Sequence, residues 1–180
     1  LVLGTGMASG CDLVAHEMTH GVTQYESNLF YYMQSGAISE AFSDIWGEFT
    51  ELTYSPGPAA DRWLIGEDLP IGAGRDMEDP TAYGQPDRMT SPYYACGGIV
   101  DDGGGVHTNS GVGNKAAFLL VDGGSFNGYT VTGMGISRTA ALFYEVQTNM
   151  LTSASDYADL YNALLQAATN LGWSDAELQN

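Results

Sequence analysis

Residues 16–20 read His-Glu-Met-Thr-His, and the fold and function of the chain are best interpreted from this pentapeptide. Apolar residues around it recur at helical spacing: Leu13, Val14, Met18 and Val22. This pattern predicts a helix over residues 10–25. Positions i and i+4 of a helix lie one turn apart on the same face, so the imidazoles of His16 and His20 can bind one zinc ion. Glu17 lies beside them, suited to take a proton from a water bound to that ion.

A catalytic zinc site needs a third protein ligand, and the position of that ligand separates the classes of metallopeptidase. A metzincin would carry Gly at position 23 and His at position 26, but this chain has Thr23 and Glu26, which excludes that class. The remaining candidate is a carboxylate on the next predicted helix, which begins at Ser35 and ends before Pro56.

That second helix carries an acidic stripe made of Glu40, Asp44, Glu48 and Glu51. Their spacing places all four on one face, where like charges repel, and no Lys or Arg of the helix separates them. The stripe therefore favours cation binding over a solvated acidic face. Glu40 can supply the third zinc ligand, and Asp44 can accept the free N–H of a zinc-bound histidine. Glu48 and Glu51 lie further along and suit a hard cation such as calcium.

The zinc-binding pattern is part of a wider resemblance to the thermolysin family of zinc metalloendopeptidases. The segments that carry the resemblance occur in matching order over nearly the whole chain: residues 16–23, 36–44, 65–68, 79–80, 104–111 and 114–117. The resemblance implies zinc-dependent hydrolysis of internal peptide bonds on the N-terminal side of large hydrophobic residues. The alternative is a non-catalytic metal-binding domain that needs a missing N-terminal domain for activity. A purely structural calcium module would leave the three histidines unexplained.

The chain is predicted to be mainly α with a long irregular middle. Residues 55–110 are rich in Gly, Pro, Asp and Ser, and such long irregular stretches are usually functional or stabilised by ions. Helical patterns resume at residues 112–121, 137–151 and 155–171, and a weak strand signal falls at residues 129–131. The resemblance implies a thermolysin-like C-terminal helical domain over residues 11–180. It also implies that residues 1–10 are a remnant of the junction with a β-rich N-terminal domain that this chain lacks.

His107 is the only histidine outside the pentapeptide, and it follows a run of two aspartates and three glycines. A lone histidine is more often a structural or surface residue. The resemblance implies instead that His107 donates a hydrogen bond to the oxyanion of the reaction, and that Asp102 orients it and keeps it protonated. It further implies that Tyr31 contacts the same oxyanion, with Tyr32 as the alternative, and that Arg75 binds the substrate carbonyl.

The resemblance also implies a structural calcium site, with ligands Asp12, Glu51 and Glu67, and Glu48 added in some relatives. Arg62 stands where the family has an aspartate, which favours one calcium ion over a pair. Ser39 stands where the family commonly has an asparagine that supports the second zinc histidine.

The charge balance excludes several classes of partner. Five Lys and Arg against 22 Asp and Glu give a formal net charge of −17, which argues against binding nucleic acid or anionic lipid. No stretch approaches the roughly 20 apolar residues of a membrane span. We expect a secreted monomer that acts on protein or peptide substrates and holds one zinc and one calcium ion. Cys11 and Cys96 either form one bridge or stay free, and the sequence leaves both open.

Overall fold

Helices make up most of the regular structure in this computed structural model, which describes residues 6–98 and 100–178. The longer helices are α1 (Cys11–Tyr25), α2 (Met33–Tyr54), α3 (Asp102–Asn109), α4 (Gly111–Asp122), α5 (Ile136–Asn149) and α6 (Tyr157–Asn170). Short helical segments are η1 (Met7–Ser9), η2 (Pro80–Tyr83) and α7 (Asp175–Leu178). The predicted mainly α class is confirmed.

The described strands form two small antiparallel pairs. β1 (Leu64–Ile65) pairs with β2 (Arg75–Asp76), and β3 (Gly124–Phe126) pairs with β4 (Tyr129–Val131). The predicted strand at residues 129–131 coincides with β4. Its partner was not predicted, although Asn127 and Gly128 between the two strands both have the positive φ that a tight hairpin turn requires.

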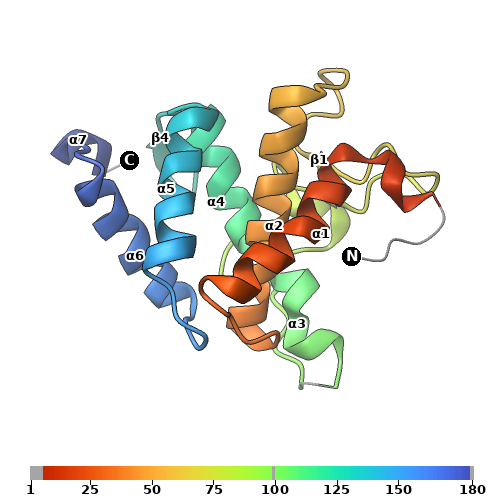
Figure 1. Cartoon of the computed structure of the whole chain (residues 1–180), viewed down its shortest axis with the longest axis horizontal. Coiled ribbons are helices and arrows are strands. Elements are labelled where there is room, and N and C mark those ends of the chain that lie inside the picture. Colours follow the sequence, from red (N-terminus) through yellow and green to blue (C-terminus); the bar gives the residue numbers. More distant parts are fainter. Residues whose placement is uncertain (1–5, 99, 179–180) are drawn as a thin grey trace.

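Helix α2 forms the centre of the molecule. Figure 1 shows α1 crossing it, with α5 and α6 on the side toward the C-terminus. Its apolar side chains are buried in the main core: Ala37, Ile38, Phe42, Ile45 and Phe49. Trp63, Phe143 and Val146 from later parts of the chain complete this core. The second predicted helix is therefore the element against which the others pack.

The backbones of helices α1 and α2 are in close contact where the two helices cross. A Cβ atom placed on Gly47 would lie 2.7 Å from the backbone oxygen of Asp12, too close for any other residue without a shift of one helix. Since α1 carries the histidine pair and α2 carries the acidic stripe, this close crossing brings the two predicted groups of ligands together.

Three expectations need correction or restriction. The irregular middle ends earlier than residue 110, because α3 begins at Asp102. Helix α2 begins at Met33, two residues before the predicted start. The predicted junction remnant falls partly on residues 1–5, which lie outside the described residues, while Met7–Ser9 form η1. Cys11 and Cys96 are both free, the first half-buried and the second exposed.

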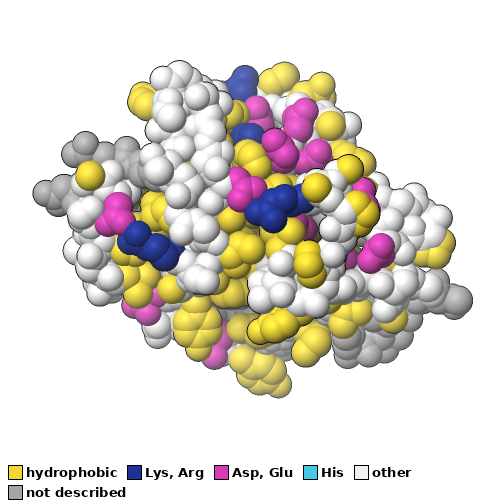
Figure 2. All heavy atoms as spheres, turned by 90° about the horizontal axis from the view of Figure 1, so that it is seen from above, with side chains coloured by type: hydrophobic (Ala, Val, Ile, Leu, Met, Phe, Trp, Pro, Cys, Tyr) yellow, Lys and Arg dark blue, Asp and Glu magenta, His cyan; other side chains and the backbone are white. Residues whose placement is uncertain are grey.

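No helix within the described part of the chain has both the length and the apolar character needed to cross a membrane. On the face seen in Figure 2, the few Lys and Arg side chains lie beside Asp and Glu side chains. The described Arg62–Asp122 and Arg138–Glu177 pairs illustrate this arrangement.

Candidate metal centre

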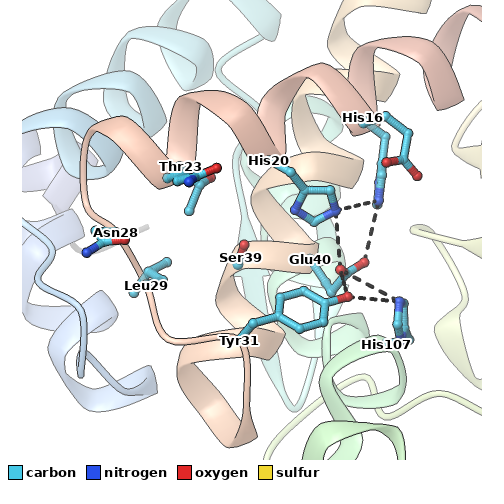
Figure 3. A pocket seen from close by; sticks show the side chains of 11 residues that line it. His16, His20, Thr23, Asn28, Leu29, Tyr31, Ser39, Glu40 and His107 are labelled. Carbon is cyan, nitrogen blue, oxygen red and sulfur yellow. Dashed lines mark hydrogen bonds and ion pairs between the residues drawn. The ribbon is translucent and has the colours of Figure 1, made fainter. Parts of the chain in front are cut away.

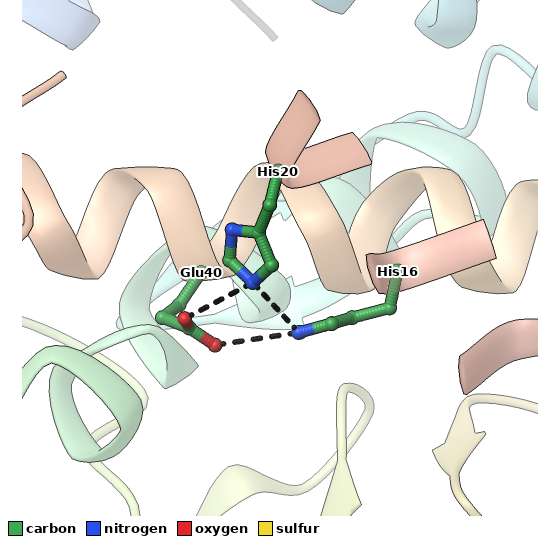
Figure 4. Close-up of side chains that lie close together, drawn as sticks. All are labelled: His16, His20 and Glu40. Carbon is green, nitrogen blue, oxygen red and sulfur yellow. Dashed lines mark hydrogen bonds and ion pairs between the residues drawn. The ribbon is translucent and has the colours of Figure 1, made fainter. Parts of the chain in front are cut away.

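The two histidines of α1 and Glu40 of α2 point toward one another (Figure 4). The Nε2 atoms of His16 and His20 lie 3.2 Å apart. Glu40 places Oε2 at 3.5 Å from His16 Nε2 and Oε1 at 3.3 Å from His20 Nε2. A tetrahedral zinc ion with ligands at about 2.0–2.1 Å sets its ligand atoms about 3.3–3.4 Å apart. The three side chains therefore have the spacing that one zinc ion requires.

Contacts on the far side of each imidazole orient the ring. His16 Nδ1 lies 2.8 Å from Asp44 Oδ1, which leaves Nε2 to act as a ligand when Nδ1 carries the proton. His20 Nδ1 lies 3.3 Å from the hydroxyl of Ser43. Ser43 was not predicted from the sequence; its position three residues after Glu40, on the same face of α2, is the signal that could have indicated it.

Asp44 is fully buried and is held by several donors. Arg75 donates from Nε to Oδ2 at 2.8 Å and from Nη2 to Oδ1 at 2.6 Å. Asn114 donates to Oδ2 at 2.8 Å. Burial alone would raise the pKa of Asp44, but Arg75 and His16 outweigh it and lower the pKa well below its usual value. The carboxylate therefore stays ionised beside His16.

The structure thus places Arg75 against Asp44, while its predicted contact with a substrate carbonyl stays a prediction. Asn114 belongs to a segment that carried the family resemblance, yet no role was predicted for it. Its amide nitrogen donates to Asp44, so it helps to hold the carboxylate that orients His16.

A polar pocket of about 430 Å³ surrounds the three predicted ligands (Figure 3). Glu17 lines this pocket and is half-buried. Within the described residues its carboxylate has no hydrogen-bond or ion-pair partner, so it is available to accept a proton. Ser39, Leu29 and Asn28 line the pocket further from His107.

Tyr31 and His107 approach the same point from two other segments. The Tyr31 hydroxyl donates to Glu40 Oε1 at 2.5 Å and lies 3.1 Å from His107 Nε2. Burial and the bond to Glu40 raise the pKa of Tyr31, which keeps its proton in place. Asp102 Oδ1 lies 2.5 Å from His107 Nδ1, as an orienting carboxylate must. The alternative, Tyr32, stacks on Phe30 instead.

A left-handed turn at the start of α3 aims His107 into the pocket. Asp102 and the three glycines that follow all have positive φ, between 51° and 89°. The turn allows the Asp102 carboxylate to accept from the backbone N–H of His107 and of Thr108 while it contacts the imidazole. Glycine permits this conformation without strain, which explains the glycine run in the sequence.

Replacing Gly104 with Ala is expected to destabilise the protein. Its φ is +86°, and an added Cβ would lie 2.5 Å from Met33 Sδ. A left-handed Ala costs about 1–2 kcal/mol, before the shift that Met33 must make. A thermal melt should therefore show a lower Tm, by about 2–8 °C for a chain of this size. Gly97→Ala is the control, since its Cβ meets nothing within 4 Å, and an equal Tm loss in both variants would contradict the prediction.

A second acidic group lies where α1, α2 and the irregular segment meet. Asp12, Glu51 and Glu67 bring carboxylate oxygens within 4.8 Å of one another. Asp12 Oδ1 and Glu67 Oε2 are buried without a hydrogen-bond partner among the described residues. Burial, and then a hydrogen bond with Glu51, raise the pKa of Glu67 to about 8. Such a group is stabilised by a proton or by a cation.

Glu48 lies near this acidic group but is not one of the three carboxylates that converge. Its Oε1 accepts the backbone N–H of Trp63 at 2.8 Å, and burial raises the pKa of Glu48 to about 8. Neighbouring Arg62 makes a bidentate ion pair with Asp122, whose Oδ2 also accepts the indole N–H of Trp63. Three of the four predicted calcium ligands are therefore brought together, and the fourth serves as a backbone acceptor.

Comparison with known families and proteins gives consistent matches. The model of the thermolysin metallopeptidase alpha-helical domain matches residues 27–180. The chain is 43% identical over 175 residues to a zinc metalloproteinase of Renibacterium salmoninarum, a match that covers 94% of this chain and 32% of that protein. It is 42% identical over 180 residues to bacillolysin of Bacillus cereus, covering 97% of this chain and 31% of that protein.

Two further matches also cover nearly the whole of this chain and only part of the matched protein. Thermolysin of Alicyclobacillus acidocaldarius is 43% identical over 178 residues, which are 96% of this chain and 31% of that protein. The precursor of protealysin from Serratia proteamaculans matches in structure with a TM-score of 0.73 at 24% identity, over 96% of this chain and 56% of that one. The chain spans about a third of the length of the curated relatives it matches.

Proposed function

Since this chain belongs to the thermolysin metallopeptidase family, we propose that it is the zinc-binding catalytic domain of an endopeptidase that hydrolyses internal peptide bonds. The observation that carries the proposal is the triangle of His16, His20 and Glu40, whose ligand atoms lie 3.2–3.5 Å apart. The residues fit zinc, since both Nδ1 atoms have partners and both Nε2 atoms face the carboxylate.

A zinc ion held there would polarise the scissile carbonyl and acidify the attacking water. Glu17 then accepts a proton from that water and passes it to the nitrogen of the leaving amine. Tyr31 and His107 supply two donors to the oxyanion, each typically worth about 3–4 kcal/mol in such a site. Asp102 orients the His107 ring through its contact with Nδ1, so that Nε2 faces the pocket.

The proposal includes a β-rich N-terminal domain and a preference for cleavage before large hydrophobic residues. Support for a covering domain comes from the outward face of α1, where Met18 is 63% and Val22 45% exposed. With Tyr144 they line an apolar hollow of about 460 Å³. Surface of this kind favours coverage by a further part of the protein. The same observation favours the second candidate function, a metal-binding domain that hydrolyses peptides only when that domain is present.

The proposed cofactors include one structural calcium ion at Asp12, Glu51 and Glu67. Carboxylate oxygens are the ligands that calcium prefers, and two oxygens of this group are buried without a partner among the described residues. Arg62, which stands where the resemblance leads us to expect an aspartate, pairs with Asp122 and supplies no carboxylate near Glu48. The missing ligand supports one ion rather than two. We further propose that the protein is a secreted monomer acting on protein or peptide substrates.

The proposed function is tested by metal analysis combined with cleavage of an internally quenched peptide. We expect one zinc per chain, loss of zinc and of cleavage with 1,10-phenanthroline, and recovery of both when zinc is returned. Zinc binding without cleavage by the 180-residue chain would favour the second candidate, provided that the protein with its N-terminal domain cleaves the peptide. Absence of zinc binding would contradict both.

A further inference from the structure

A single buried amide, that of Gln147 on α5, contacts both helices that carry the predicted zinc ligands. The Gln147 side chain is only 1% exposed. Its amide oxygen accepts the indole N–H of Trp46 on α2 at 2.7 Å. Its amide nitrogen donates to the hydroxyl of Thr23 on α1 at 2.9 Å. Because α5 itself carries no predicted ligand, the amide joins the two ligand-bearing helices from outside the site.

The two partners of this amide lie close in sequence to metal ligands. Thr23 follows His20 by three residues, on the same face of α1, and lines the pocket of the zinc site (Figure 3). Trp46 follows Glu40 by six residues, which is about 9 Å along α2. A displacement of Thr23 relative to Trp46 would therefore change the 3.3 Å separation of His20 Nε2 and Glu40 Oε1.

Few other polar contacts among the described residues hold the C-terminal half of α1 against α2. The apolar hollow described above is also lined by Gln147, so open space replaces packed side chains there. The short polar contacts between α1 and α2 involve Asp12 and His16 in the first half of α1. In the second half, the polar contacts between α1 and α2 among the described residues are those of His20 with Ser43 and with Glu40, both at 3.3 Å.

We infer that Gln147 is a positioning residue that sets the spacing of the zinc ligands by holding the C-terminal half of α1 against α2. The inference rests on the proposed zinc site. Without the amide, the Thr23 hydroxyl and the Trp46 indole lose buried partners, and α1 can move relative to α2. Loss of the amide should therefore change the coordination geometry of the bound metal as well as lower the stability of the fold.

The test replaces zinc with cobalt, whose visible absorption reports the ligand geometry. Gln147→Met keeps the length of the side chain and removes both hydrogen bonds. We expect altered cobalt bands and metal binding about 10-fold weaker in competition with a chelator, as for contacts that support metal ligands. Thr139→Val is the matched control, because Thr139 on α5 is fully buried and its hydroxyl donates to the Leu120 carbonyl of α4 instead. The control should lose stability and keep the wild-type cobalt spectrum.

A second variant, Thr23→Val, removes only the bond to α1 and leaves Gln147 bonded to Trp46. It should change the cobalt spectrum in the same direction, and the double variant should add little to either single one. If Gln147→Met and Thr23→Val lower the Tm while the spectrum and the metal affinity stay those of the wild type, the role of the amide is structural only and the inference is overturned. A wild-type protein that bound neither metal would overturn the proposed function as well.

Discussion

Glu17→Gln is expected to lower the rate of peptide hydrolysis by about 10²–10⁴-fold, the usual contribution of a general base, while zinc stays bound. The amide has nearly the shape of the carboxylate but cannot accept the proton of the attacking water. Glu17 is not one of the three converging ligands, so its replacement leaves the triangle of His16, His20 and Glu40 intact. The measurement is kcat/KM on an internally quenched peptide, together with the zinc content of the purified variant.

Glu26→Gln is the matched control for this experiment. Glu26 follows the last residue of α1, is exposed, and does not line the pocket. The same loss of one negative charge there should leave kcat/KM within about twofold of the wild type, because solvent and salt screen an exposed charge that does not line the pocket. A Glu17→Gln variant with full zinc content and the wild-type rate would contradict the assignment of Glu17 as the base.

Removing calcium is expected to cost the protein more stability than removing zinc. Without zinc, His16, His20 and Glu40 keep partners in Asp44, Ser43 and Tyr31. Without calcium, Asp12 Oδ1 and Glu67 Oε2 are buried with no hydrogen-bond partner among the described residues. At a calcium concentration 100-fold above its Kd the ion adds about 2.7 kcal/mol. This corresponds to a rise in Tm of about 5–10 °C for a chain of this size.

The pH dependence of the calcium-free protein follows from the raised pKa of Glu67. Its usual pKa is 4.5, and in the folded protein it rises to about 8, first through burial and then through the bond to Glu51. The folded state therefore holds a proton that the unfolded state has lost between these two values. The stability linked to this proton is fully present below about pH 4.5 and is lost as the pH rises toward 8. The Tm without calcium should fall over this interval.

Thermal melts at pH 5 and pH 8 test both statements. Zinc is removed with 1,10-phenanthroline, and calcium with a chelator to which zinc is then added back. Calcium should suppress most of the fall in Tm between the two pH values, and Glu67→Gln should lose this response. Glu78→Gln, at an exposed position outside the acidic group, should keep it. Equal Tm values with and without calcium at pH 8 would show that no ion binds there.

The three candidate zinc ligands could be proposed from the sequence because their spacing is a property of helices. His16 and His20 share a face of any helix that contains them. Glu40 belongs to a row of acidic side chains that repel one another on one helix face, and in the sequence alone a bound cation is the simplest reason for such a row. The proposed oxyanion donors Tyr31 and His107 were inferred from the resemblance alone, since neither belongs to a periodic pattern. The two side chains converge because the chain makes a left-handed turn before His107. The sequence shows the glycines that permit this turn, but it does not show the direction in which the turn aims the imidazole.

Polar contacts between distant elements were the part that sequence could not provide. Ser43 lies beside His20, and Asn114 and Arg75 lie beside Asp44, only because α1, α4 and β2 are packed against α2. Glu48 belongs to the same acidic stripe, but its carboxylate accepts the backbone N–H of Trp63. This contact depends on where the chain after α2 packs, which the spacing of the stripe does not indicate.

The sequence by itself determined the mainly α class, most of the longer helices and the three candidate zinc ligands, because these follow from local spacing along the chain. The tertiary structure decided which buried carboxylates share a cation and which accept hydrogen bonds. It also decided that a glutamine on α5 joins the two helices of the metal site. Such contacts join residues as far as 124 positions apart, and no local pattern encodes the packing that brings them within hydrogen-bond distance.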